Sequence, residues 1–198
     1  MKTWIALATV ALFATAPAFA ADSPPAMSAE QQAMMEKMTK AATPGPQHEQ
    51  MKKWAGEWNA KVKFQMDPSQ PWQESQSTST ITLLMDGRYC QEVVSGQMMG
   101  APFNGMGITG YDNVLGKYVS TWIDNMGTGV MTSQGTADAS GKVITFVGTS
   151  SDPVTGKPAK VRMVSTIADD DHHTLDMYSV PPGGKKEMKT MTIEYTRK

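Results

Sequence analysis

The sequence predicts an all-β protein: an antiparallel, up-and-down β-barrel of about ten strands that follows an N-terminal helical extension. Three observations favour this fold class. Turn motifs that open with Asp and close with Gly recur along the chain, strand-like segments separate them, and no long helical crossover interrupts the series. A sheet of about ten strands normally curls or closes, because closure removes its exposed edges.

The recurring turns begin at Asp112, Asp124, Asp138, Asp152, Asp169 and Pro181. Asp favours the start of a turn because its carboxylate accepts hydrogen bonds from the backbone N–H groups just ahead. Gly favours the end because it enters left-handed conformations without strain. The even spacing fits one strand between neighbouring turns, so we interpret the motifs as structural turns and not as calcium sites.

Strand-like residues dominate the chain from Glu57 onward. We expect strands at 57–66, 74–84, 88–96, 103–111, 116–124, 129–137, 142–150, 158–168, 172–180 and 186–197. Asp86-Gly87 predicts a tight hairpin, whereas 97–102 reads as a Gly/Met-rich loop. Both faces of the strand at 116–124 mix apolar and polar side chains. A barrel with a partly polar, partly aromatic lumen gives that pattern, and so does a sandwich with a wet outer face.

The first 20 residues have the pattern of a secretory signal peptide. Lys2 precedes an apolar stretch, and Ala18-Phe19-Ala20 is a small-x-small cleavage site. We expect cleavage after Ala20 and a periplasmic or secreted protein, with no integral membrane span in the remaining chain. The alternative is a retained anchor, which the short, Ala-rich apolar stretch disfavours.

Residues 21–46 are expected to form a flexible lead and a Met-rich helix. Ser28-Ala-Glu-Gln31 fits a capping box, good helix formers follow to about Ala42, and Pro44-Gly45-Pro46 ends the helix. A second short helix is expected over 47–54. Residues 47–198 then form a single β-barrel domain.

The composition excludes some functional classes. Without residues 1–20 the chain has 17 basic and 19 acidic side chains, so nothing indicates a nucleic-acid partner. Cys90 is the single cysteine, so no internal disulfide can form, and we expect it to be buried and inert. G-x-S-x-G, P-loop and H-E-x-x-H motifs are absent. We therefore expect a non-enzymatic protein without a cofactor.

The motifs at the two ends of the predicted barrel resemble the signature of the calycin group, the relatives of lipocalins and fatty-acid-binding proteins. Gly56-Glu57-Trp58 opens the first strand, and Arg197 closes the last. The resemblance implies that Trp58 seals the barrel base and that Arg197 packs across it. A guanidinium can stack on an indole while it donates to nearby carbonyl groups.

A narrower resemblance covers residues of about 47–197, which are similar to the bacterial domain-of-unknown-function family 1579. The segments that carry it are Trp54-Ala-Gly-Glu-Trp58, Asp86-Gly-Arg88, Met99-Gly-Ala-Pro-Phe103, Gly105-Met-Gly-Ile-Thr-Gly-Tyr-Asp112, Lys117-Tyr-Val-Ser-Thr-Trp-Ile-Asp124, Asp152-Pro-Val-Thr-Gly156 and Ile193-Glu-Tyr-Thr-Arg197. The resemblance implies a calycin-like barrel in a secreted or soluble bacterial protein. It implies no activity, because the family has none assigned.

The predicted ligand-binding residues are charged or aromatic side chains of the expected strands: Arg88, Glu92, Tyr118, Trp122, Asp124 and Tyr178. A buried charge needs a partner, so an inward-facing Arg88 would pair with Glu92 or with an Asp. In a lumen such a group can orient a ligand carboxylate. The alternatives are structural ion pairs, charges that face water, and aromatic rings that fill the core.

Methionine is unusually frequent: 16 remain after removal of residues 1–20. Met is an adaptable filler of cores and apolar pockets, which is the interpretation that we favour. Thioethers also bind Cu(I). The alternative copper-binding set is Met34, Met35, Met38, Met98, Met99 and His172. His172 and His173 are adjacent on a strand and point to opposite faces, so they do not share one ion. Some calycin-like barrels hold haem through one such imidazole.

The leading hypothesis is an exported, non-enzymatic protein that binds a small, partly apolar molecule in the barrel lumen. Two other classes stay open. In one, side chains fill the barrel and the Met-rich helix docks a protein partner. In the other, the protein handles copper through Met and His.

Overall fold

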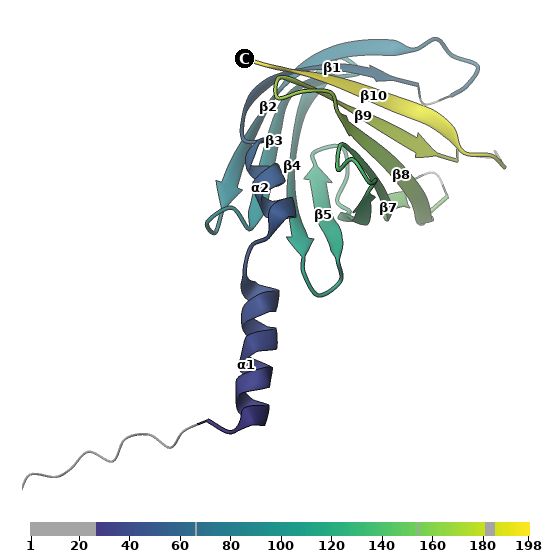
Figure 1. The fold of residues 1–198 in the computed structure, drawn as a ribbon. Helices are drawn as coiled ribbons and strands as arrows, with labels where there is room; N and C mark the ends of the chain where they lie inside the picture. Colours follow the sequence, from purple (N-terminus) through teal and green to yellow (C-terminus); the bar gives the residue numbers. More distant parts are fainter. Residues whose placement is uncertain (1–26, 66, 154, 181–184) are drawn as a thin grey trace, which may run out of the picture.

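The computed structural model describes residues 27–65, 67–153, 155–180 and 185–198. The predicted signal peptide, its cleavage site and the turn at Pro181 lie outside these residues. Ten antiparallel strands form a closed barrel in which neighbours follow chain order and β10 pairs with β1 (Figure 1). This confirms the predicted fold class. The strands are β1 (Gly56–Phe64), β2 (Gln73–Leu84), β3 (Tyr89–Met98), β4 (Ala101–Asp112), β5 (Lys117–Asp124), β6 (Met131–Ala137), β7 (Val143–Asp152), β8 (Lys157–Ile167), β9 (His172–Ser179) and β10 (Met188–Arg197).

The loop expected over 97–102 is instead a two-residue turn. β3 and β4 pair as far as Met98 and Ala101, so only Met99 and Gly100 connect them. Both have positive φ, 52° and 78° respectively. Two-residue hairpins need that geometry to match the twist of their strands, and Gly100 adopts it without strain.

Two helices precede the barrel. In α1 (Ala29–Ala42) the capping box is present: Gln31 N donates to Ser28 Oγ at 3.2 Å, and Ser28 N donates to Gln31 Oε1 at 2.9 Å. No residue of α1 is buried, and the helix projects away from the barrel (Figure 1). α2 (Pro46–Lys52) lies against the barrel and buries His48 and Met51. Among the described residues, neither helix has the length and apolarity to cross a membrane.

The N-terminal segment from Ala41 to Trp58 covers one end of the barrel, here called the closed end. Its turns are 85–88, 113–116, 138–142 and 168–171. Gln50 Nε2 donates to the carbonyl of Gly141, and Asn113 Nδ2 donates to the carbonyl of Thr43. The opposite end, with the β1–β2 connection and the Met99-Gly100 turn, is called the mouth. No described helix covers it.

The core is densest at the closed end. Met51, Trp58, Tyr118 and Ile144 are almost fully buried there. Beyond this layer, some inward-facing side chains keep partial exposure, including Leu175, Met177, Met191 and Ile193, whereas Phe64, Val161 and Met163 are buried. The lumen is therefore filled at the closed end, and part of its inner wall beyond that end is accessible.

Candidate functional site

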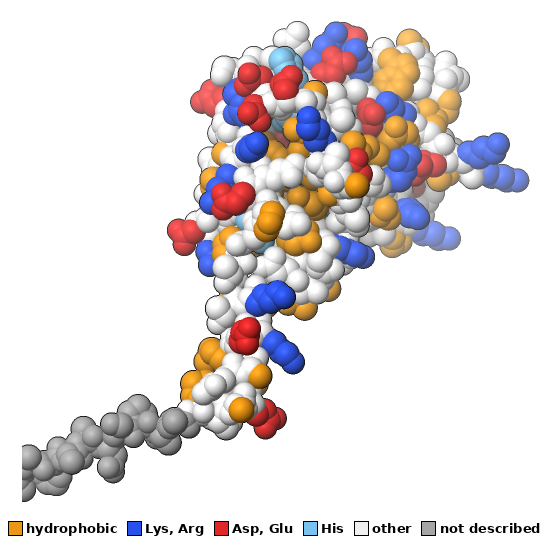
Figure 2. Space-filling view, in the orientation of Figure 1, with side chains coloured by type: hydrophobic (Ala, Val, Ile, Leu, Met, Phe, Trp, Pro, Cys, Tyr) orange, Lys and Arg blue, Asp and Glu red, His pale blue; other side chains and the backbone are white. Residues whose placement is uncertain are grey.

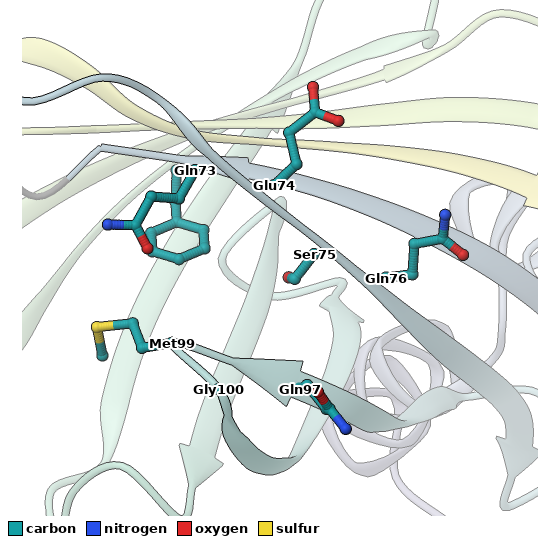
Figure 3. Close-up of a pocket in the computed structure, with 8 residues that line it drawn as sticks. Gln73, Glu74, Ser75, Gln76, Gln97, Met99 and Gly100 are labelled. Atoms are coloured by element: carbon teal, nitrogen blue, oxygen red, sulfur yellow. The ribbon is translucent and has the colours of Figure 1, made fainter.

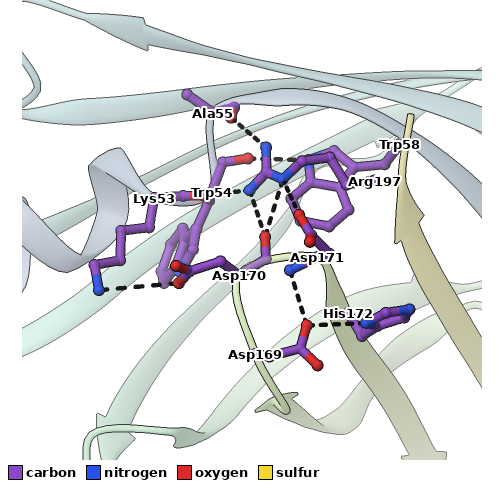
Figure 4. Close-up of polar contacts among 9 residues, drawn as sticks. All are labelled: Lys53, Trp54, Ala55, Trp58, Asp169, Asp170, Asp171, His172 and Arg197. Carbon is purple, nitrogen blue, oxygen red and sulfur yellow. Dashed lines mark hydrogen bonds and ion pairs between the residues drawn. The ribbon is translucent and has the colours of Figure 1, made fainter.

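The floor of the lumen is a seal made by β1 and β10 (Figure 4). The guanidinium of Arg197 lies 4.1 Å from the centre of the Trp58 ring. Arg197 Nη1 donates to the Ala55 carbonyl at 2.9 Å, and Nη2 donates to the carbonyls of Lys53 at 2.8 Å and Asp170 at 2.7 Å. Arg197 therefore ties three chain segments together, in the contact that the calycin resemblance implies.

His173 forms the next layer above this floor. Its ring stacks on Tyr195 at 4.2 Å and meets the Trp58 ring edge-on at 4.5 Å. Burial, assisted by the charge of Arg197, lowers the pKa of His173 to about 4, so the imidazole is neutral at physiological pH. His172 points outward and contacts Asp169 at 2.9 Å. The two imidazoles thus face opposite sides of the wall, as expected.

Glu92 is the ionisable group at the centre of the site. It extends from β3 into the lumen, where Ser79 Oγ donates to its carboxylate at 2.7 Å and the Tyr195 hydroxyl hydrogen-bonds to it. Burial raises the pKa of Glu92, and these two hydrogen bonds oppose the shift. Among the described residues no Lys or Arg forms an ion pair with Glu92. The lumen therefore contains a carboxylate without a cation.

Trp122 lies along the lumen wall beside Glu92. A Cβ at Gly105 would lie 2.3 Å from Trp122 Cζ2, and one at Gly107 would lie 2.9 Å from Cε3. Only glycine leaves room for the indole to lie across β4 at these two positions. Trp122 Nε1 donates to Asp124 Oδ2 at 2.8 Å. The indole N–H is thus satisfied, and one face of the ring packs on β4.

Small hydroxyl groups complete the polar part of the lumen. Ser120 Oγ and Thr109 Oγ1 bond to each other at 3.0 Å. Ser75 Oγ and Ser133 Oγ are buried and have no hydrogen-bond partner among the described residues. Buried hydroxyls normally have hydrogen-bond partners, so these two hydroxyls are unusual features of the inner wall.

A pocket of about 720 Å³ opens at the mouth (Figure 3). It exists because β2 and β3 separate there: their pairing stops at Ser77 and Gly96, whereas β2 stays paired with β1 as far as Gln73. Phe64, Ser75 and Met99 are among its lining residues. Phe64 and Ser75 face the lumen, whereas Glu74 and Gln76 face outward, so the pocket lies at the rim of the barrel between the inner and outer faces of β2.

The structure brings together three of the six predicted ligand-binding residues. Glu92, Trp122 and Asp124 face the accessible lumen. Tyr118 also faces inward, but it is 1% exposed and fills the core at the closed end.

Two of the six lie elsewhere. Arg88 is part of the β2–β3 turn, where its guanidinium donates to the carbonyls of Met85 and Ala42, so it does not pair with Glu92. Tyr178 lies on the outer face with the guanidinium of Arg162 3.8 Å above its ring. Sequence reasoning also missed Ser79, Ser133 and Tyr195.

The predicted copper set is not brought together. Met34, Met35 and Met38 lie on α1, Met98 and Met99 lie at the mouth, and His172 lies outside the closed end. The described residues contain no cluster of three or more His, Cys, Asp or Glu that could hold a metal ion. Another group of methionines faces the lumen instead: Met131, Met163, Met177 and Met191.

The closed ten-stranded wall, the seal and the accessible lumen define a calycin-like β-barrel protein. The chain belongs to the family described as "Protein of unknown function (DUF1579)", whose model matches residues 43–197. It is similar to the crystal structure of Rv2717c from M. tuberculosis, with 14% identity, a TM-score of 0.60 and coverage of 79% of this chain and 99% of that chain. A redesigned beta barrel has 13% identity, a TM-score of 0.40 and coverage of 75% and 94%. The likeness to Rv2717c shows the fold alone. None of the curated proteins matches the chain.

Proposed function

We propose that this protein is exported, is not an enzyme, and binds a small, partly apolar molecule in the barrel lumen. The observation that carries the proposal is the pair of buried, unpartnered hydroxyls, Ser75 Oγ and Ser133 Oγ, on the inner wall. An unpaired buried hydroxyl costs about 1–3 kcal/mol. A bound molecule that hydrogen-bonds to these groups removes that cost.

The apolar part of the lumen supports the same proposal. Met177, Met191 and Ile193 face inward and keep partial exposure, so they offer apolar contact surface to a bound molecule. Met side chains adapt to irregular ligands because they are flexible and polarisable. The mouth pocket of about 720 Å³ lies within the usual range for small-molecule sites.

The ionisable groups support a binding role over a catalytic one. Burial, with a smaller effect from Glu92, raises the pKa of the Cys90 thiol to about 12, and its Sγ donates to the Met51 carbonyl at 3.4 Å. A thiol in that state is a poor nucleophile. His173 lies between two aromatic rings, away from any described Ser or Cys hydrogen-bond partner.

Titration with a neutral, apolar fluorescent dye tests the lumen. We expect saturable binding of one dye per chain. Ser75→Phe should weaken it at least about tenfold, because the new ring occupies the lumen beside Phe64. Thr78→Phe adds the same ring to the outer face of the same strand and should leave binding unchanged. Equal effects of both variants, or no saturable binding, would contradict the proposal.

The export part of the proposal depends on the sequence of residues 1–20. Native mass spectrometry of protein from its own host tests it together with ligand retention. We expect a mature chain that begins at Ala21 and carries additional non-protein mass. A full-length chain in the cytoplasmic fraction would contradict export.

Copper binding at α1 is a second candidate, and the exposure of three thioethers favours it. Met34, Met35 and Met38 are 63%, 52% and 57% exposed. Hydrophobic side chains are visible on the surface of the projecting helix (Figure 2). Positions three and four apart on a helix are neighbours, so all three sulfurs can approach one soft ion. Cu(I) titration against a competing chelator tests this. Loss of binding in Met38→Leu, with full binding in Met106→Leu, would support it.

A further inference from the structure

We propose that the lumen selects organic cations: ammonium compounds with an apolar tail, in preference to fatty-acid anions of the same length. This inference rests on the proposed function and specifies the chemical class of the ligand. It follows from the signs of the inward-facing charges, from the missing partner of Glu92 and from the orientation of Trp122.

Between the floor and the mouth, the charged side chains that the register places inside are carboxylates; Lys157, which the register also places on the inner face, lies at the mouth end of β8 opposite Asp152. Residues paired across the strands share a face, and this register places Glu92 and Asp124 inside. The described Lys and Arg of the strand interiors face outward, as shown by Lys63 with Glu194 and Arg162 with Glu187. Arg197 faces inward only at the floor, where it caps backbone carbonyls. An anionic headgroup at the depth of Glu92 would thus meet two carboxylates and, among the described residues, no Lys or Arg that forms an ion pair with either of them.

Glu92 lacks the counter-charge that a buried carboxylate needs. No ion pair among the described residues includes Glu92 or Asp124. Ser79 and Tyr195 donate hydrogen bonds to Glu92, which orient the carboxylate but leave its charge uncompensated. Removing an unpaired charge from water is costly, whereas a charge-assisted contact in a low-dielectric site is strong. A ligand ammonium supplies the missing charge.

Trp122 provides the second contact. Its N–H is occupied by Asp124 and one ring face covers Gly105 and Gly107, so the other face points away from β4 into the lumen, and the side chain keeps partial exposure. The face of an indole is its electronegative surface and attracts cations within about 6 Å of the ring centre. Because the indole N–H already donates to Asp124, it cannot donate to a ligand carboxylate, whereas the ring face can still attract an ammonium group.

The register places these two contacts on either side of one glycine. Gly107 is directly opposite Glu92 on β3 and directly opposite Trp122 on β5. Their backbones are therefore about two strand spacings, or about 10 Å, apart. The indole already covers Gly107, so the ammonium group would lie on the opposite face of the ring, on the side of the Glu92 carboxylate. The apolar tail then extends along Met131, Met177 and Met191 toward the mouth.

Three ligands with the same C12 tail test the proposal: dodecyltrimethylammonium, dodecanol and laurate. Each competes below its micelle concentration with the neutral dye bound to the purified protein. We expect the cation to bind at least about tenfold more tightly than laurate, with dodecanol between them. Glu92→Gln should lower the affinity for the cation about tenfold and change the affinity for dodecanol by less than about threefold. Trp122→Leu should weaken the cation by about three- to thirtyfold.

Glu194→Gln is the matched control, because it removes the same charge from the outer face of β10. It should leave all three affinities unchanged. Laurate binding as tightly as the cation, or Glu92→Gln weakening all three ligands equally, would overturn the cation preference while the lumen function stands. If none of the three displaces the dye, both the lumen function and the preference fail.

Discussion

Arg197, in the last strand, stacks on Trp58 in the first strand, with its guanidinium 4.1 Å from the centre of the indole. The contact joins the two strands that close the barrel, and Trp58 Nε1 donates to the Trp54 carbonyl at 3.0 Å. Since Arg197 also bonds to carbonyls before β1 and between β8 and β9, it fixes the floor on which the lumen rests.

Replacing Arg197 tests the importance of this seal. Arg197→Lys keeps the charge but loses the planar fork that reaches three carbonyls, so we expect the free energy of unfolding to fall by about 2–3 kcal/mol. Chemical denaturation measures it. Arg162→Lys is the control, because Arg162 also covers an aromatic ring and binds a carboxylate, but on the outer surface. It should cost less than about 1 kcal/mol. Equal losses would contradict the account.

His173 should make stability depend on pH. Its pKa in the folded protein is about 4, below the ordinary 6.5, so between these values the unfolded chain binds a proton that the folded chain does not. The stability is complete above pH 6.5 and falls by about 2 kcal/mol as the pH approaches 4. The groups that face His173 are Trp58, Tyr195 and Arg197.

His173→Phe should flatten that pH dependence, because a phenyl ring can stack on Tyr195 and has no proton to bind. Denaturation curves from pH 7 to 4 provide the measurement. His172→Phe changes the neighbouring, outward-facing imidazole and should keep the wild-type slope. A slope that persists in His173→Phe would assign the pH dependence to other groups.

Glu92→Gln should stabilise the empty protein. The pKa of Glu92 is raised on folding, so its ionised form opposes folding above that pKa. We expect a gain of about 1 kcal/mol or more at pH 7 that disappears as the pH falls below the ordinary Glu range, where the carboxyl is protonated in both states. Ser79, Tyr195 and the Cys90 thiol are the groups around it. Glu194→Gln should change stability by less than about 1 kcal/mol. A destabilised Glu92→Gln at pH 7 would contradict the uncompensated charge.

Removal of α1 should leave the barrel folded. The sequence places the start of the barrel domain at residue 47, but the carbonyls of Ala41 and Thr43 accept hydrogen bonds from Asn113. We therefore place the limit at residue 40. A chain that begins at Ala41 should match the full chain within about 0.5 kcal/mol. A chain that begins at Lys53 loses buried Met51 and should unfold. Thermal unfolding distinguishes the two truncated chains. A stable chain that begins at Lys53 would contradict the view that α2 is part of the barrel core.

The barrel was predictable because its turns have local causes. In the turn at Asp112, the carboxylate accepts from the N–H groups of Val114 and Leu115, and Gly116 has a φ of 64°. These interactions involve residues at most four apart, so the sequence displays them directly. Trp58 and Arg197 were predictable for another reason: the resemblance to a known group implied their contact.

The direction of side chains was harder to predict, because shifting a strand by one residue reverses its faces. Arg88 lies in a turn and not in a strand, because Met85, Asp86 and Gly87 all take positive φ. Tyr178 follows inward-facing Met177, and both are apolar enough to face the core. The serines of β2 could have been recognised as one face of the strand, since Ser75, Ser77 and Ser79 occupy every second position and alternate with other polar residues. Only the three-dimensional register shows that they line the lumen beside Glu92.

The methionines permit the most direct test of lumen binding. Protein labelled with ¹³C at the Met methyl groups gives probes in the lumen, at Met131, Met177 and Met191, and internal controls on α1, at Met34 and Met38. Titration with dodecyltrimethylammonium should shift the lumen signals, saturating at one ligand per chain, and leave the α1 signals unchanged. Saturation that affects only the α1 methionines, or the absence of any saturable shift, would contradict the account.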